Sequence, residues 1–168
     1  MIKSLPRFSL CLLPLVFGLV GCETFDKGAT QEVAVKTFPA GATVMLDGED
    51  IGRTPTEIEL SRKIPHRVIL KKEGYKTIDA TIAPVKNEAG QGYVRFGLMD
   101  DAGLYYDLDP NPVEINLVPA VLPPSRGPDA YEEMATIIAE VDQKREAGQI
   151  GPVEHKYMVD QVIEFYSN

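Results

Sequence analysis

The sequence predicts a mainly β fold, a small antiparallel β-sandwich, followed by a C-terminal α-helical hairpin. Between residues 31 and 119, short segments alternate apolar and polar residues and are separated by turns rich in Gly, Pro and Asp. Beyond residue 128 the period of the apolar residues changes from two to about 3.6, which is typical of amphipathic helices. The chain of 168 residues is long enough for one domain with a small addition.

A signal peptide is expected over residues 1–21. Lys3 and Arg7 give it a basic start, and an apolar run of 13 residues follows, from Phe8 to Val20. This run is short for a permanent transmembrane helix, and Pro14 interrupts it. The segment is therefore interpreted as a leader that is removed from the mature protein.

The end of this leader, Leu19, Val20, Gly21 and Cys22, resembles the lipobox of bacterial lipoproteins. The resemblance implies that the Cys22 thiol receives a diacylglyceryl group and that its amine is acylated after cleavage, with palmitate among the acyl chains. The alternative is an ordinary secreted thiol without an internal disulfide, because the other cysteine, Cys11, lies in the leader. Residues 22–30 would tether the fold to the lipid. By enterobacterial sorting habits Glu23 favours the outer membrane, facing the periplasm.

The charge of the chain argues against nucleic acid as a partner. The formal net charge is −8, and removal of the leader takes away two basic residues. Nucleic-acid binding depends on cationic side chains that neutralise phosphates, and an acidic chain offers few of them.

Five segments are predicted as strands that are buried on one face. They are EVAVKTF (32–38), ATVMLDG (42–48), TEIELS (56–61), HRVILKK (66–72) and TIDATIA (77–83). The residues between them are those that make tight reversals, because Gly reaches positive φ and Pro fixes φ near that of a turn. Strands this short with such turns indicate a sandwich or a small barrel.

The stretch FPAGATVMLDGEDIGRTPTEIEL, followed by HRVILKKEGYK, resembles the PEGA domain over residues 33–82. The matching residues are Pro39, Gly41, Asp47, Gly48, Gly52, Thr54, Pro55, Gly74 and Tyr75, with Ala40 where the family has Glu. The resemblance implies a small β-sandwich that serves envelope proteins as an interaction or spacing module, without catalytic residues or cofactors. We interpret the motif residues as shaping the backbone, and Tyr75 as a core residue whose hydroxyl bonds to the backbone.

Three further strands are predicted in the rest of the sandwich, which we expect to span residues 31–119. They are YVRFGLM (93–99), GLYYDLD (103–109) and PVEINLVP (112–119), with a hairpin turn at residues 100–103 between the first two. The region also resembles envelope lipoproteins that carry a Gly-rich apolar insertion and a motif formed here by Tyr106, Leu108 and Pro110. Arg95 and Asp100 argue against insertion of the shortened segment into a membrane.

A Pro-rich linker is predicted over residues 120–128, and a helical hairpin over residues 129–168. Asp129 should cap the first helix together with Glu132, Gly148 should end it, and Gly151-Pro152 should begin the second. The predicted apolar faces are Tyr131, Met134, Ala135, Ile138 and Val141, and then Met158, Val159, Val162, Ile163 and Tyr166.

The hairpin resembles the C-terminal SHOCT module at Ala147, Gly148, Ile150 and Glu154, with Gly151 in place of the usual Thr. This resemblance implies oligomerisation. A hairpin of this size cannot bury enough surface to stand alone, so it should pack on the sandwich, a second copy or another protein.

Residues for catalysis are few. The chain has two histidines, His66 and His155, which we expect at the surface, and it has no nucleophile elbow or phosphate loop. Asp100, Asp101, Asp107 and Asp109 lack the spacing of a Ca²⁺ loop, so we predict no metal site and interpret them as solvated turn residues. The protein is therefore not expected to be an enzyme.

Six basic residues form a candidate basic face in an otherwise acidic protein: Arg62, Lys63, Arg67, Lys71, Lys72 and Lys76. Such a face would suit anionic envelope polymers, although the solvent side of an amphipathic hairpin has the same composition. The leading hypothesis is a non-catalytic anchored adaptor whose hairpin binds an envelope protein or a second copy. The alternative is a module for carbohydrate or peptidoglycan, which an exposed platform of Tyr93, Tyr105 and Tyr106 would favour.

Overall fold

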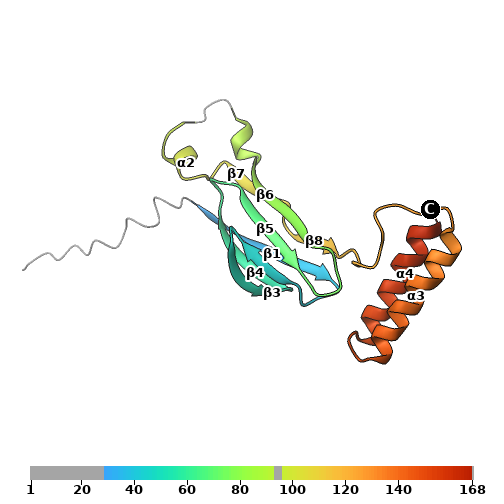
Figure 1. Cartoon of the computed structure of the whole chain (residues 1–168). Coiled ribbons are helices and arrows are strands. Elements are labelled where there is room, and N and C mark those ends of the chain that lie inside the picture. The colour runs from blue at the N-terminus through green and yellow to red at the C-terminus, as the bar shows by residue number, and fades with distance from the viewer. Residues whose placement is uncertain (1–28, 93–95, 168) are drawn as a thin grey trace, which may run out of the picture.

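The computed structural model describes residues 29–92 and 96–167, which form a pair of β-sheets followed by two long antiparallel helices (Figure 1). The predicted signal peptide, the Cys22 anchor and most of the tether lie outside the described residues. The strands are β1 (Thr30–Phe38), β2 (Thr43–Leu46), β3 (Glu49–Arg53), β4 (Thr56–Ser61), β5 (His66–Lys71), β6 (Ile78–Lys86), β7 (Tyr106–Asp109) and β8 (Val113–Asn116).

The two sheets have the strand orders β4-β1-β8 and β3-β2-β5-β6-β7. Their facing sides share one core of valine, leucine and isoleucine: Val33 and Val35 (β1), Val44 (β2), Leu60 (β4), Val68 and Leu70 (β5), Ile82 (β6), Leu108 (β7) and Val113 (β8). Side chains of a strand alternate between its two faces, so the predicted period of two places this apolar set between the sheets. The predicted β-sandwich is confirmed.

One pair of strands departs from the antiparallel prediction. β8 runs parallel to β1, with Val35 opposite Val113, whereas the other pairs among the named strands are antiparallel. A parallel pair needs a crossover connection, and here the five-stranded sheet forms most of it. The pairing of β8 with β1 completes the three-stranded sheet, as predicted for the last strand of the sandwich.

Two local predictions were wrong. Residues 50–52, interpreted as a tight reversal, lie in strand β3, because the reversal is completed at Asp47 and Gly48, which both have positive φ (50° and 98°). Residues 98–99, predicted as strand, lie in the one-turn helix α2 (Leu98–Asp101), and residues 93–95 lie outside the described ranges. A short 3₁₀ helix, η1 (Ala89–Gln91), precedes them, and β7 begins at Tyr106.

The turns after β1 and after β3 are joined by hydrogen bonds to Thr54, a buried residue between β3 and β4. Its Oγ1 accepts a hydrogen bond from the Ala42 N–H (3.0 Å) and lies 2.6 Å from Thr37 Oγ1. Its carbonyl accepts from the Gly41 N–H (2.8 Å), and its own N–H donates to the Ala42 carbonyl (2.9 Å). Thr54 thus ties the turn after β1 to the turn after β3, which explains why a small hydroxyl side chain occupies this buried position.

The hairpin consists of α3 (Ala130–Glu146) and α4 (Pro152–Ser167), and Gly148 ends α3 with a φ of 70°. Four details differ from the prediction. The Asp129 side chain makes no capping hydrogen bond, and Tyr131 and Ala135 of α3 and Ile163 of α4 are exposed. Met134, Ile138 and Val141 lie inward as predicted, and Ile137 is partly buried as well.

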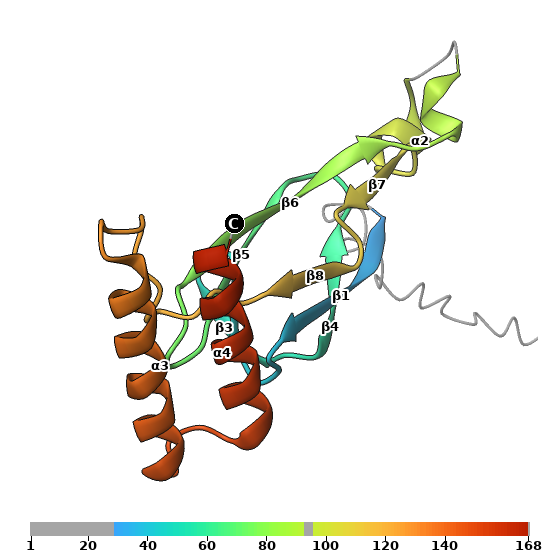
Figure 2. The ribbon, with the colours of Figure 1, turned by 90° about the vertical axis from the view of Figure 1, so that its right-hand side faces the viewer.

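The hairpin packs against one end of the sandwich (Figure 2). A second core joins Ala42, Tyr75 and Leu117 of the sandwich to Val141 of α3 and Met158 of α4. The connecting segment takes part, since Tyr75 forms a bridge with Pro119 and the Ala120 N–H donates to the Gly74 carbonyl (2.9 Å). The start of the Pro-rich segment is therefore packed onto the sheets before the chain turns into α3.

Candidate functional site

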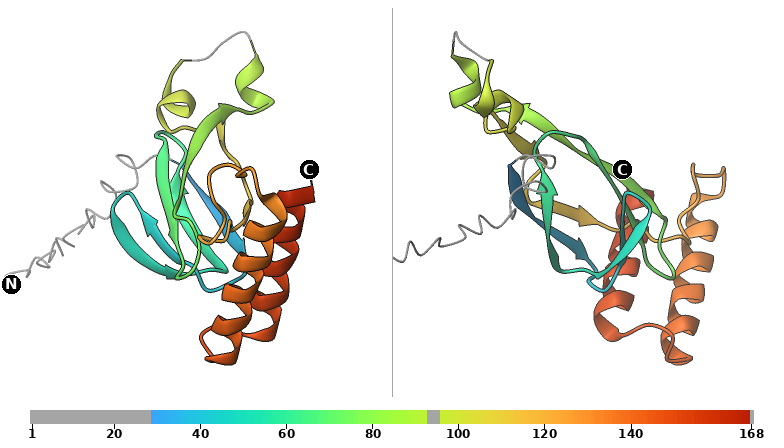
Figure 3. Two further views of the ribbon diagram at one scale, coloured as in Figure 1. Left: turned by 45° about the vertical axis from the view of Figure 1, so that its right-hand side comes forward. Right: turned by 90° about the vertical axis from the view of Figure 1, so that its left-hand side faces the viewer.

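The place where α4 meets the sandwich, which we call the junction, is formed mainly by one helix turn. The Tyr157 hydroxyl donates to the Leu117 carbonyl (2.9 Å), and its ring lies edge-on to Phe38 with centroids 4.8 Å apart. Met158 packs beside Gly74, where a Cβ would lie 3.4 Å from the methionine methyl. Figure 3 shows α4 standing beside the ends of the strands. The hairpin is thus held in a defined direction.

An ion pair reinforces this contact. Lys72 Nζ, just after β5, lies 2.9 Å from Glu154 Oε1 in the first turn of α4. About four fifths of the lysine side chain and three quarters of the glutamate side chain are buried. Partial burial reduces screening by solvent, so this ion pair should contribute more to the stability of the fold than the exposed ion pairs on the surface.

Two tyrosines at the junction differ in how their hydroxyls are satisfied. Burial, reinforced by Glu154 and Tyr157, raises the pKa of Tyr75. The Tyr75 hydroxyl is buried without a hydrogen-bond partner among the described residues, so the predicted backbone partner is wrong. Burial also raises the pKa of Tyr157, with a smaller effect of Glu164, but its hydroxyl has the Leu117 carbonyl as acceptor.

A cleft of about 540 Å³ opens beside the junction, between the sandwich and the turn from α3 to α4. Four of its lining residues are basic and two are acidic: Arg53, Lys71, Lys72 and Lys144 against Glu73 and Glu154. The start of α4 also lies at this cleft, and a helix N-terminus adds partial positive charge. We call this the junction cleft; its lining has a net positive charge in an acidic protein.

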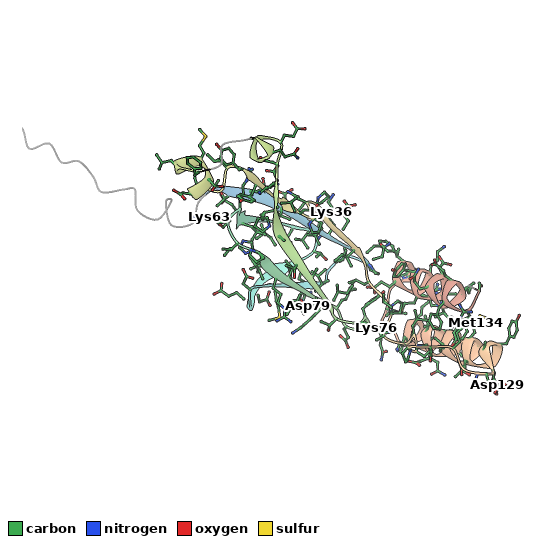
Figure 4. All side chains as sticks on the ribbon, turned by 90° about the horizontal axis from the view of Figure 1, so that it is seen from above. Lys36, Lys63, Lys76, Asp79, Asp129 and Met134 are labelled. Carbon is green, nitrogen blue, oxygen red and sulfur yellow. The ribbon has the colours of Figure 1, made fainter. Side chains whose placement is uncertain are left out.

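The six predicted basic residues are spread over both ends of the sandwich, as the positions of Lys63 and Lys76 in Figure 4 illustrate. Arg62 and Lys63 lie against Gly103, and Arg62 pairs with Asp107 (3.0 Å). Arg67 pairs with Asp79 through Nε (3.0 Å) and Nη2, and these bonds lower the pKa of Asp79. The six residues therefore form no single face: Lys71 and Lys72 lie at the junction cleft, and Arg62 and Lys63 lie together at the opposite end of the sandwich.

Both histidines differ from the surface positions that we expected. His66 is buried at the start of β5, with Nδ1 2.8 Å from Asp47 Oδ2 and Nε2 3.1 Å from the Ser61 carbonyl. Although burial opposes it, hydrogen bonds from His66 and from the Arg67 N–H hold the pKa of Asp47 below its usual value. His155 is partly buried, and its Nε2 lies 2.6 Å from Asp142 Oδ1. Both rings have structural partners.

The sequence held signals for some residues that we missed. His66 lies on the same face of β5 as the buried Val68 and Leu70, because the three alternate along the strand. The period of two therefore already predicts that His66 is buried. Arg53, Lys144 and Glu154 reach the junction cleft from segments far apart in the chain, and only the docking of the hairpin brings them together.

The structure also describes the acidic residues and two of the three tyrosines that were considered as sites. Asp100 and Asp101 line a cavity with Lys63, and within residues 29–92 and 96–167 no group of three or more His, Cys, Asp or Glu side chains could hold a metal ion. Tyr105 and Tyr106 are partly buried, and Tyr93 lies outside the described residues. None of the helices described is both long and apolar enough to cross a membrane.

Residues 30–96 match the PEGA domain family. This segment of the chain is a PEGA domain. The match contains the predicted core of residues 33–82 and begins with β1, but β7 and β8, which complete the two sheets, lie beyond it. No curated protein and no solved structure matches the chain.

The two junction tyrosines give a matched test of the docking contact. Tyr157→Phe removes a hydroxyl that donates to Leu117 and should lower the free energy of unfolding by about 0.5–1.5 kcal/mol. Tyr75→Phe removes a buried hydroxyl without a partner among the described residues and should leave stability unchanged or raise it. Urea unfolding followed by circular dichroism measures both variants. Equal losses in the two would show that the Tyr157 hydrogen bond contributes nothing specific.

Proposed function

We propose that this chain is a non-catalytic, lipid-anchored protein of the bacterial cell envelope, in which the PEGA domain serves as a spacer and the hairpin recruits a second protein or a second copy. The observation that carries the proposal is the docked hairpin. Its inner face is used within the chain, at Val141, Met158 and Val162, while the opposite surface is left for a partner. The hairpin is thereby presented in one direction.

The surface available to a partner includes a groove of about 510 Å³ between the connecting segment and the two helices. Val121, Pro123 and Ile137 give it apolar patches, and Arg126, Glu132 and Glu133 line it with charge. Tyr131, with 86% of its surface exposed, lies in the first turn of α3 beside this end of the hairpin. Exposed aromatic residues with a mixed polar rim are typical of protein interfaces.

Two resemblances support an interaction role. The match to the PEGA family is consistent with a spacer or interaction module that has no catalytic residues of its own. The likeness of the hairpin to the SHOCT module, at Ala147, Gly148, Ile150 and Glu154, favours oligomerisation through α3 and α4.

The anchor is proposed at Cys22, with the protein held at the outer membrane and facing the periplasm. The lipobox-like residues 19–22 support it, because several acyl chains together give stable attachment where one gives only a marginal one.

Mass analysis of the N-terminal peptide from the native host tests the anchor. The expected peptide begins at Cys22 and carries a diacylglyceryl group and an amide-linked acyl chain. A Cys22→Ser variant should keep its leader and lack this mass. A wild-type peptide without any fatty acid would contradict the anchor.

The recruiting surface can be tested by photo-crosslinking in cells. Benzoylphenylalanine in place of the exposed Tyr131 should give a crosslinked species, which mass spectrometry identifies as a second copy or another envelope protein. The same amino acid in place of Thr81, exposed on β6 in the sandwich, is the matched control. Crosslinking from neither position, or equally from both, would contradict recruitment by the hairpin.

The junction cleft favours a second candidate function, binding of an anionic envelope glycan such as peptidoglycan. Its four basic residues outnumber its two acidic ones, and Arg53 and Lys71 are both exposed at its edge. A cationic cleft attracts polymers with carboxylate or phosphate groups, and that attraction weakens with salt.

Charge reversal distinguishes this candidate from general electrostatic attraction. Arg53→Glu with Lys71→Glu should reduce sedimentation with isolated cell wall several-fold, because the cleft loses two cations and gains two anions. Lys63→Glu with Lys86→Glu changes the net charge equally, away from the cleft, and should leave sedimentation nearly unchanged. If both double variants lose sedimentation equally, or neither does, the cleft is not a glycan site.

A further inference from the structure

The segment between β6 and β7 lies at the end of the sandwich opposite the hairpin (Figure 1, Figure 2). It exposes four large apolar side chains. The exposed fractions are 82% for Phe96, 70% for Leu98, 58% for Met99 and 44% for Leu104. Single exposed apolar residues are common, but four within nine residues at a projecting end are not. We call this set the distal tip.

The backbone of the distal tip is held by its own hydrogen bonds. The Asp101 N–H donates to the Gly97 carbonyl (3.0 Å), and the Leu104 N–H donates to the Met99 carbonyl (3.0 Å). Gly97 and Gly103, with φ of 107° and 77°, reverse the chain on either side of α2. This local structure displays the apolar side chains outward rather than burying them.

The chain enters the fold beside the distal tip. Ala29, the first described residue, donates its N–H to the Ala102 carbonyl (2.5 Å) and accepts from the Arg62 N–H (2.9 Å). Cys22 precedes Ala29 by seven residues. A fully extended stretch of that length spans at most about 25 Å. An anchor at Cys22 therefore holds this end of the protein close to the bilayer, whatever the path of the tether.

We infer that the distal tip rests on the lipid surface to which Cys22 is anchored, with Phe96, Leu98 and Met99 in the interfacial layer. The inference rests on the proposed anchor, and it concerns contact with the interface rather than insertion across the membrane. The free energy falls when apolar side chains leave water for the lipid interface. The tether also removes most of the entropic cost of bringing them to the bilayer.

The charges around the distal tip indicate which lipids it suits. Asp100 and Asp101 line a cavity with Lys63. These two carboxylates do not attract anionic lipids, so zwitterionic headgroups are the expected partner. A shallow contact, in which the carboxylates stay in water, does not require the membrane insertion against which Arg95 and Asp100 argue.

The chain offers a clean spectroscopic test because it contains no tryptophan, and Cys22 is the only cysteine after the leader. A chain that begins at Cys22 keeps every described residue and can be joined at that thiol to a maleimide lipid in phosphatidylcholine vesicles. Phe96→Trp places one fluorophore at the distal tip. Tyr131→Trp places one on the hairpin as the matched control.

Phe96→Trp should shift its emission to the blue on vesicles and be quenched by brominated acyl chains, and Leu98→Asp in the same chain should abolish most of the shift. Tyr131→Trp should show neither effect. No shift at Phe96→Trp, with circular dichroism unchanged, overturns the inference and leaves a protein partner as the occupant of the tip. Shifts at both positions overturn the orientation. Because the lipid is attached chemically, these outcomes are independent of whether the host acylates Cys22.

Discussion

The packing of one turn of α4 against the end of the sandwich sets the direction of the whole hairpin. Tyr157 and Met158 fill the space above Phe38, Gly74 and Leu117, and the ion pair from Lys72 to Glu154 closes the side of the contact. Position 74 favours glycine because its φ is 81°, whereas a Cβ there would only come into van der Waals contact with the Met158 methyl, 3.4 Å away. Without this contact the junction cleft and the direction of the hairpin would both be lost.

The sandwich was largely predictable because its signals are local. A strand buried on one face shows a period of two whatever it pairs with, so β1, β2, β4, β5 and β6 follow from the order of apolar residues. Strand β3 was missed since its residues, Glu49 to Arg53, are those of an exposed edge, where charge and Gly are tolerated. The parallel pairing of β8 with β1 depends on residues about 80 apart in the chain, and no local pattern encodes it.

The junction and its cleft were less predictable because they too are formed by residues far apart in the chain. Lys71 and Lys72 stood out within a basic run, but Arg53, Lys144 and Glu154 become neighbours only when the hairpin docks. The apolar face of α3 also differs from the prediction, because Tyr131 and Ala135 are exposed and Ile137 is partly buried. Periodicity predicts that a helix has an apolar face, whereas the surface it meets decides which residues complete that face.

The distal tip and the junction lie at opposite ends of the described fold, and strand β1 connects them. β1 begins beside α2 and ends beside the junction, so a single strand of nine residues connects the entry of the chain to the docking surface of the hairpin. A strand rises about 3.3 Å per residue, so β1 alone separates the two ends by roughly 30 Å. Since β1 pairs on both sides, with β4 and β8, it cannot bend freely as a tether does. The anchor proposed before β1 would therefore act at the end of the sandwich with the distal tip, and β1 would fix the distance from that end to the hairpin.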